Sequence, residues 1–430
     1  MRAETFEASG RALERALEVI PLGAQTFSRS HIQFPEGQAP LFLTHGDGGH
    51  VWDVDGNEYI DLVCGLMPVL LGYRDPHVDE AIRRQLDLGI TFSLATELEA
   101  EVAEKLIEAV PCAEMVRFGK NGSDATTGAI RVARAATGRE RIAICGYHGW
   151  HDWYVGSTTR NKGIPKETRG LTHSFLYNDI SSLSSLFDNF PGEIAAVIME
   201  PMNMLEPEKG FLQSVAKLTR SENAVLIFDE IITGFRFARG GAQEYFGVTP
   251  DLAAFGKAMG NGMPISAVVG KRDLMVEMEE IFFSSTFGGE ALSLAAANAV
   301  LDKLKREPVI DKLWHLGSEL VGNVRKKIDE IGLQDIICIR GKAPWTVIDI
   351  VDHPKARKEA IKTALLAELN SLGVLTVGVQ SICLAHTPDD VSRVVQAYEL
   401  ALPKIRSGID SGRLEQNLTC PVIEPVFKVR

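Results

Sequence analysis

The 430-residue chain lacks the features of several specialised protein classes. No apolar run approaches the ~20 residues that span a bilayer, so we expect no membrane helix. Positive charge is not in excess, and the net charge of −12 argues against nucleic acid or anionic membranes as partners. Charged residues occur throughout the N-terminal segment, so we expect no secretory signal and a cytoplasmic protein.

Cysteines are few and scattered, with no close pair that indicates a metal or redox motif. We interpret them as buried small hydrophobes or inert thiols in a reducing compartment, and we expect no metal site. They are Cys64, Cys112, Cys145, Cys338, Cys383 and Cys420.

The order of the sequence patterns predicts two domains, as expected for a chain longer than the ~250–300 residues of one hydrophobic core. From about residue 75, helical patterns alternate with the apolar runs EMVRFG, RIAICG, IAAVIME, AVLIFDE and PISAVVG. This alternation predicts an α/β sheet of parallel strands. We expect residues 66–300 to form this large domain, and residues 1–65 and 301–430 to form a smaller α+β domain built from both termini.

Ligands of such sheets gather at the carboxyl ends of the strands, so the residues that end the runs are candidates for a site. In KNGSDATTGAIR, Gly122, Ser123 and Asp124 stand where a helix begins after a strand. Free backbone N–H groups and the helix dipole predict a phosphate site there. A plain helix cap is the alternative, because Ser and Asp favour that position anyway.

Other strand ends carry aromatic and acidic side chains. Tyr147 and His148 follow RIAICG, where a ring can stack on a flat heteroaromatic ligand. Glu200 and Asp229 end two strongly apolar strands, and a carboxylate there is costly unless it is paired. The partner is either an arginine or a ligand nitrogen.

Lys257 lies in FGKAMGNGMP, among small, apolar and glycine residues. Dry surroundings lower the pKa of a lysine, so that its neutral amine becomes nucleophilic and forms Schiff bases. Together with the phosphate loop, the tyrosine and Asp229, it indicates pyridoxal 5'-phosphate (PLP), whose pyridine nitrogen an aspartate holds protonated.

With these motifs the chain resembles the class III aminotransferases of fold type I, and the resemblance covers nearly all of it. FDEIITGFR and FGKAMGNGMPISAVVG are similar to the family's aspartate and Schiff-base lysine motifs, which implies catalytic roles for Asp229 and Lys257. SSTFGGEA resembles the loop whose threonine, here Thr286, reaches the phosphate of the neighbouring subunit. The resemblance implies a large domain with a mostly parallel mixed sheet, PLP as cofactor, and a homodimer.

Within the family, the chain is most similar to the glutamate-1-semialdehyde aminomutase-like branch. Ile232 stands near the ring hydroxyl, where that branch has an aliphatic or thioether residue, and Arg29 matches its arginine for the substrate carboxylate. Leu22 replaces a glycine of that branch, and Glu290 replaces an asparagine. Trp150 lies in an unusually aromatic stretch that either packs in the core or lines a wider substrate pocket.

The resemblance implies an enzyme that moves an amino group from an amine donor to a carbonyl acceptor through Lys257, in a pyridoxal/pyridoxamine cycle. Intramolecular transfer by an aminomutase is the main alternative. A decarboxylase or racemase would use the same cofactor contacts, and a regulator without turnover is expected to have lost the lysine, the aspartate or the phosphate loop. The donor, the acceptor and the pathway stay open.

Overall fold

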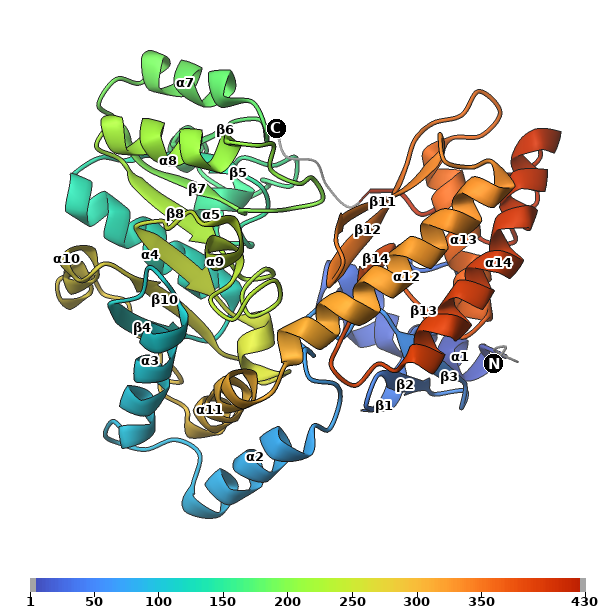
Figure 1. The fold of residues 1–430 in the computed structure, drawn as a ribbon, viewed down its shortest axis with the longest axis horizontal. Coiled ribbons are helices and arrows are strands. Elements are labelled where there is room, and N and C mark those ends of the chain that lie inside the picture. Colours follow the sequence, from blue (N-terminus) through green and yellow to red (C-terminus); the bar gives the residue numbers. More distant parts are fainter. Residues whose placement is uncertain (1–4, 426–430) are drawn as a thin grey trace. The chain divides into compact units, whose positions relative to one another are not determined.

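A computed structural model describes residues 5–425, which divide into two compact units (Figure 1). Residues 76–310 form one unit, called the large unit here, and residues 5–75 with 311–425 form the other, called the small unit. Both observed boundaries lie ten residues after the expected ones, at 76 rather than 66 and at 311 rather than 301. No helix of the described part of the chain has the length and apolar character needed to cross a membrane.

A seven-stranded sheet in the order β4-β10-β9-β8-β7-β5-β6 is the centre of the large unit. Its strands are β4 (Met115–Gly119), β5 (Arg141–Cys145), β6 (Thr172–Ser174), β7 (Ile194–Met199), β8 (Val225–Asp229), β9 (Leu252–Phe255) and β10 (Ser266–Gly270). The neighbours from β9 to β6 pair in parallel, whereas β10 pairs antiparallel with both β4 and β9. The sheet is therefore mixed and mostly parallel, as expected.

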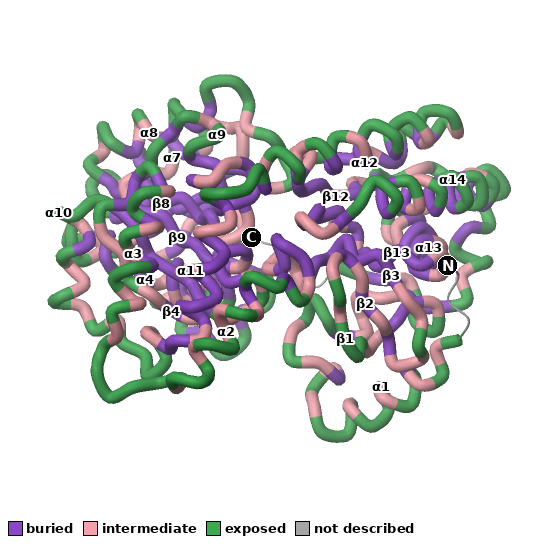
Figure 2. The backbone as a smooth tube through the Cα atoms, turned by 60° about the horizontal axis from the view of Figure 1, so that its bottom comes forward, coloured by how far each residue is buried: buried purple, intermediate pink, exposed green. Residues whose placement is uncertain are grey.

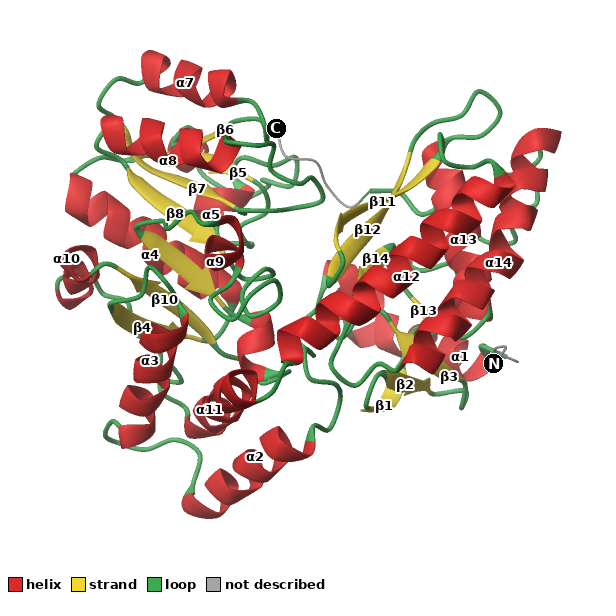
Figure 3. Cartoon of the chain, viewed as in Figure 1, coloured by secondary structure: helices red, strands yellow, loops and turns green. Residues whose placement is uncertain are grey.

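Helices connect these strands (Figure 3). The longer ones are α2 (Pro76–Leu88), α3 (Glu97–Ala109), α4 (Gly122–Thr137), α7 (Ile180–Asn189), α8 (Phe211–Ser221) and α11 (Ala291–Arg306). Short helices are α5 (Asp152–Val155), α6 (Lys166–Arg169), α9 (Ala242–Phe246) and α10 (Arg272–Met275).

Helix α4 packs across β7, β8, β9 and β10. Ala125, Ala129 and Ala133 recur every four residues, are fully buried, and belong to one core cluster with Ile198 and Ile227 of the sheet. Their small side chains let the helix lie close to the strands. Figure 2 shows the strands β8 and β9 in the colour of buried residues. The sheet core thus fixes where α4 begins.

The small unit contains two sheets and long helices. One sheet has the order β1 (Leu43–Asp47), β2 (His50–Asp53), β3 (Glu58–Asp61) and β13 (Val374–Leu375); the other has β11 (Ile337–Lys342), β12 (Trp345–Ile350) and β14 (Val379–Ser381). The helices are α1 (Glu7–Val19), α12 (Val309–Ile331), α13 (Lys358–Ser371) and α14 (Pro388–Ser411). Because β13 pairs in parallel with β3, the two ends of the chain share one sheet.

The last helix begins with a reciprocal side-chain cap. Thr387 caps α14, its side chain accepting from the N–H of Asp390, and the Asp390 carboxylate accepts in return from the N–H of Thr387 at 2.9 Å. Pro388 occupies the first turn, where its missing N–H costs nothing. The Nε2 atom of His50, on β2, lies 2.9 Å from Asp390, so this helix end is bonded to the neighbouring sheet.

Leu22 adopts a left-handed backbone, with φ at +63°. Glycine takes this conformation without steric cost, whereas a leucine is strained in it. Leu22 therefore occupies a left-handed backbone conformation that suits the glycine found at this position in the related branch.

Candidate active site

Strand direction brings the predicted residues to one edge of the large sheet. Strands β5, β7, β8 and β9 run in parallel as neighbours, so their carboxyl ends meet at the same edge. Tyr147 follows β5, Glu200 follows β7, Asp229 ends β8, and Lys257 follows β9. The sheet topology thus gathers four residues that are spread over more than a hundred positions of the sequence.

Lys257 stands at a strained turn directly after β9. Its φ of +36° lies in the left-handed region, which residues other than glycine rarely adopt, and Asn261 and Gly262 also have positive φ values. Burial lowers the pKa of the Lys257 amine to about 8, against the opposing effect of the nearby Asp229 and Glu200 carboxylates. A larger fraction of this amine is therefore neutral, and thus nucleophilic, than in an ordinary lysine.

Asp229 is buried and its carboxylate is held from two sides. The Nδ1 atom of His148 lies 2.8 Å from Oδ2, and the N–H of Ile231 donates to Oδ1 at 3.1 Å. A carboxylate accepts hydrogen bonds, so His148 carries a proton on Nδ1. Tyr154 packs edge-on against the imidazole, which is also buried. His148 is thus a partner of Asp229 rather than a group open to solvent.

Glu200 is a second buried carboxylate at this edge. Its Oε2 atom accepts from the N–H of Tyr147 at 3.1 Å. Burial and, to a smaller extent, the negative charge of Asp229 together raise the pKa of Glu200 to about 7, against the opposing effects of His148, the Tyr147 N–H and Lys257. Glu200 therefore changes protonation state near neutral pH, in electrostatic contact with Asp229 and Lys257.

The N-terminus of α4 follows β4, whose carboxyl end lies at the same edge because β4 and β9 are both antiparallel to β10. Gly122 and Ser123 lie in the first turn, where a helix leaves its N–H groups without carbonyl partners. The Asp124 carboxylate accepts from the N–H groups of Lys120 and Asn121 at 3.0 and 2.7 Å. Asp124 therefore shapes this turn through a capping box.

The segment after β5 packs against this helix start. Ser123 Oγ accepts from the N–H of Trp150 at 3.2 Å. A Cβ atom at Gly149 would lie 2.3 Å from Ser123 Oγ, and one at Gly146 would lie 2.3 Å from Glu200 Oε2, so both glycines permit close approach. The Tyr147 ring is half exposed and meets Tyr154 edge-on, with ring centroids 5.5 Å apart.

The two tryptophans of the segment after β5, Trp150 and Trp153, lie in different surroundings. Trp153 is buried in the sheet core, and its indole N–H donates to Thr127 Oγ1 at 2.8 Å. The Trp150 side chain is 69% exposed. The core alternative therefore holds for Trp153, while Trp150 is available on the surface of the large unit.

Two candidates lie elsewhere in the chain. Arg29 is in the small unit, exposed, and donates from a terminal guanidinium nitrogen to the carbonyl of Gly65 at 2.9 Å. Thr286 is exposed in the loop between β10 and α11. Ile232 is partly buried in the turn after β8, where its carbonyl accepts from Arg236 Nε at 3.2 Å.

Sequence reasoning did not assign three charged residues near this edge. Glu230 is buried and accepts from the N–H groups of Ala242 and Gln243, both at 2.8 Å, so it caps α9. The Arg236 side chain is fully buried, and its positive charge lowers the pKa of Lys257. Lys120 pairs with Glu290 at 2.8 Å. Glu290, the partner of Lys120, was noted in the sequence because it departs from its branch.

The chemistry of these side chains fits PLP. The large unit offers a buried amine with a lowered pKa, a buried carboxylate for a pyridine nitrogen, a helix N-terminus for a phosphate, and an aromatic ring. His148 Nε2 and Ser266 Oγ are buried polar atoms with no hydrogen-bond partner among the described residues. A buried polar atom without a partner costs free energy, and a bound polar group offsets this cost.

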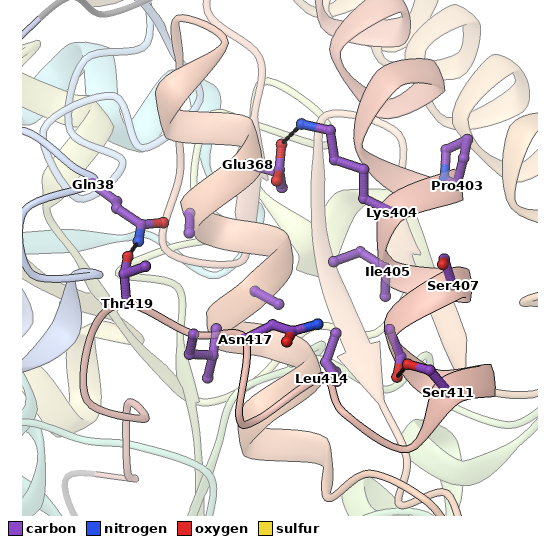
Figure 4. Close-up of a pocket in the computed structure, with 14 residues that line it drawn as sticks. Gln38, Glu368, Pro403, Lys404, Ile405, Ser407, Ser411, Leu414, Asn417 and Thr419 are labelled. Atoms are coloured by element: carbon purple, nitrogen blue, oxygen red, sulfur yellow. Dashed lines mark hydrogen bonds and ion pairs between the residues drawn. The ribbon is translucent and has the colours of Figure 1, made fainter.

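The small unit has a surface pocket of about 470 Å³ between α13, α14 and the segment that follows α14 (Figure 4). Its charged side chains, Lys404 and Glu368, pair with each other at 2.5 Å, and Gln38 is bonded to Thr419 across it. Among the described residues, the pocket therefore presents no unpaired charge to a ligand, and it contains none of the predicted site residues.

Known proteins resemble this chain over nearly its whole length. Residues 32–389 match the family profile of the class-III aminotransferases. The chain is 37% identical to 3-aminobutyryl-CoA aminotransferase of Cloacimonas acidaminovorans (strain Evry) over 91% of its length and 96% of the relative's. It is 40% identical to glutamate-1-semialdehyde 2,1-aminomutase of Acetivibrio thermocellus, over 78% of this chain and 83% of that one.

A solved structure shares the fold. The FumI protein of Sphingopyxis sp. MTA144, solved with PLP, superposes with a TM-score of 0.88 at 30% identity, covering 96% of this chain and 99% of FumI. The expected fold type and family are therefore confirmed. The chain belongs to the class III aminotransferases, the PLP-dependent enzymes of fold type I.

Proposed function

We propose that the protein transfers an amino group from an amine donor to a separate carbonyl acceptor, with Lys257 as the residue that attaches PLP and moves the proton. The observation that carries this proposal is the cluster of the partly buried Lys257 with the buried Asp229 and Glu200, in which the lysine pKa is lowered to about 8. An amine in this state serves both as nucleophile and as proton carrier.

Each predicted residue then has a physical role. Bound PLP supplies an aldehyde that combines with amines and a pyridine ring that accepts an electron pair. Asp229, oriented by His148, holds a proton at the pyridine nitrogen. Gly122 and Ser123 donate N–H groups to the phosphate, and Asp124 keeps their turn in shape. The ring of Tyr147 packs against the cofactor.

Further residues complete the proposed site. Lys257 Nζ accepts a proton from the substrate carbon and returns it during the transfer. Glu200 adjusts the charge around Asp229 and Lys257, and Ile232 would lie near the ring hydroxyl of the bound cofactor. Arg29 binds a substrate carboxylate through its planar guanidinium, which suits bidentate pairing. Trp150 offers an aromatic surface to the substrate.

We also propose a homodimer in which Thr286 reaches the phosphate of the neighbouring subunit. Support comes from an apolar surface on the large unit. Leu88 is 74% exposed, Leu94 is 85% exposed and Phe282 is 83% exposed. The stretch with Leu88 and Leu94 meets the start of α11, because the N–H of Ala291 donates to the carbonyl of Ile90 at 2.9 Å, and Phe282 lies in the loop that precedes α11. A patch of this kind fits a second copy of the chain. Six free thiols support a cytoplasmic location.

Replacing Lys257 by alanine tests the attachment. We expect the variant to retain no PLP after borohydride reduction and denaturation, and to have no measurable transfer activity, whereas the wild-type chain retains the cofactor on the peptide that contains Lys257. A Lys271→Ala variant serves as the control, since Lys271 is partly exposed and pairs with Asp251. Retention of PLP and activity by Lys257→Ala would contradict the proposal.

The aminomutase is the second candidate, and the similarity to glutamate-1-semialdehyde 2,1-aminomutases favours it. Coverage does not separate the two candidates, because the Alkaliphilus oremlandii aminomutase matches 93% of this chain and the 3-aminobutyryl-CoA aminotransferase 91%. Intermolecular transfer is preferred because the chain departs from the aminomutase branch at Leu22 and Glu290. The test is to incubate the PLP-loaded enzyme, without any acceptor, with 3-aminobutyryl-CoA or with glutamate 1-semialdehyde. Stoichiometric release of a keto product with one turnover supports intermolecular transfer. Multiple turnovers that isomerise the amine support the aminomutase.

A further inference from the structure

Three soft ligand atoms meet in the small unit. The Sγ atoms of Cys64 and Cys383 and a ring nitrogen of His386 all lie within 4.8 Å of one another. Each of the three residues is 1% exposed. Cys64 follows β3, whereas Cys383 and His386 lie in the turn between β14 and α14. Cys383 and His386 are separated by two residues, so one turn carries both a thiol and an imidazole. The fold brings Cys64, from the N-terminal segment of the small unit, next to them.

One polar atom of this cluster lacks a hydrogen-bond partner among the described residues. The Cys64 thiol donates to the carbonyls of Asp61 and Ser381 at 3.3 and 3.4 Å, so it is not this atom. His386 Nδ1 accepts from the N–H of Cys383 at 3.0 Å, and His386 Nε2 is buried with no hydrogen-bond partner among the described residues. A buried imidazole of this kind is stabilised by a further ligand.

Two carboxylates lie close to the cluster along the chain. Asp390 stands four residues after His386 in the first turn of α14, and Asp61 three residues before Cys64 at the end of β3. Asp61 is itself held in place, because it accepts from the N–H groups of Val63 and Cys64 and from the Tyr73 hydroxyl at 2.6 Å. Two thiolates would balance the charge of a divalent ion, so that the buried site carries little net charge.

Room for the imidazole is made by a glycine. A Cβ atom at Gly49 would lie 2.4 Å from His386 Cδ2, which is closer than two atoms can approach. The backbone after β3 is strained, with positive φ at Cys64, Leu66 and Met67. The three ligands are therefore supported by residues from both segments of the small unit.

We propose that Cys64, Cys383 and His386 form a binding site for a thiophilic d¹⁰ cation, Zn²⁺ or Cu⁺. Thiolate and imidazole ligands suit both ions, and binding releases the two thiol protons to solvent. The bound ion joins the segment after β3 to the turn before α14 and fixes the strained backbone at residues 64–67. The Gly65 carbonyl that holds Arg29 lies in this segment.

The test uses the full-length, PLP-loaded enzyme, treated with a thiol reductant and then with excess Zn²⁺ or, without oxygen, Cu⁺. After desalting over a chelating resin, elemental analysis is expected to find one bound ion per chain, and the comparison of the two ions identifies the preferred one. Co²⁺ in place of Zn²⁺ is expected to produce a sulfur-to-cobalt charge-transfer band, which needs no variant and reports thiolate ligation directly.

Variants locate the ion. Cys64→Ser and Cys383→Ser are each expected to weaken metal affinity at least about tenfold, since even outer partners of metal ligands contribute this much. Cys338→Ser, at a partly exposed cysteine outside the cluster, serves as the matched control and keeps the wild-type stoichiometry. Failure of the wild-type enzyme to retain either ion, equal retention by all three variants, or a Cys64–Cys383 disulfide in the purified protein would overturn the proposal.

Discussion

At the scale of single residues, the surroundings of the proposed catalytic lysine determine its chemistry more than its sequence motif does. Lys257 is held in a left-handed backbone, and burial, not a neighbouring cation, is the main cause of its lowered pKa. Two carboxylates oppose this effect. The pKa of about 8 is therefore a balance between desolvation and attraction, and changing either carboxylate shifts it.

This balance predicts a pH dependence for the capture of PLP by the cofactor-free chain. Only the neutral Lys257 amine reacts, so below pH 8 the capture rate is expected to fall about tenfold per pH unit. Glu200 raises the lysine pKa, so Glu200→Gln lowers it and moves the rate profile to lower pH. Stopped-flow absorbance measures both profiles, and Glu167→Gln, at an exposed position, is the control. A shift of the Glu200→Gln profile to higher pH would refute the argument.

His148 is expected to act through Asp229. His148→Phe removes the donor that lies 2.8 Å from Asp229 Oδ2, and we predict a fall in kcat of about 10–100-fold with a smaller change in KM. His148→Asn keeps an N–H donor on a shorter side chain and is expected to recover part of the loss. Steady-state kinetics with one donor and one acceptor give both parameters. Equal losses for the two variants would indicate a packing role only.

At the scale of elements, the start of α11 is bonded to the turn before α4, where we propose that the phosphate binds. The Glu290 side chain accepts from the N–H groups of Leu292 and Ser293 and pairs with Lys120, directly before the turn that begins α4. Burial alone would raise the pKa of Glu290, but the hydrogen bonds from Lys120 and Ser293 lower it below its usual value. Glutamate in place of the branch's asparagine thus adds an ion pair to a helix cap.

Two substitutions separate these contributions. Glu290→Ala removes both the cap and the ion pair and is expected to destabilise the protein by about 1–2 kcal/mol. Glu290→Asn keeps a capping side chain and loses only the ion pair, so we expect a smaller decrease in Tm but weaker retention of PLP. Thermal unfolding and PLP titration measure the two effects. A Tm for Glu290→Asn as low as that of Glu290→Ala would show that the ion pair, not the cap, stabilises this region.

At the scale of the whole molecule, the exposed apolar surface of the large unit predicts association. Phe282→Glu places a charge in this surface, so we expect the variant to be monomeric in analytical ultracentrifugation and the wild-type chain to form the proposed dimer. If Thr286 completes the neighbouring site, the same variant loses PLP more readily on dialysis. Leu176→Glu is the matched control, because Leu176 is 66% exposed on the large unit outside this surface. A Phe282→Glu variant that stays dimeric would exclude this surface as the interface.

Much of the molecule follows from local sequence patterns. The apolar runs predicted five of the seven strands of the large sheet, because buried parallel strands are continuously apolar. The other two strands, β6 and β9, are the shortest of the sheet and were not among these runs. The Thr387 cap was predictable because capping depends on residues within one turn. The class III motifs were sufficient to identify the family and its cofactor, since each motif is a contiguous stretch.

The tertiary structure decided what depends on residues distant in the sequence. Desolvation of Lys257, the contact between His148 and Asp229, and the burial of Arg236 arise only when separate strand ends meet at one edge. The same holds for Cys64 and Cys383, which are unrelated in sequence but adjacent in the small unit. Local patterns are set by backbone geometry within a few residues, whereas burial and charge are set by all the atoms that surround a group.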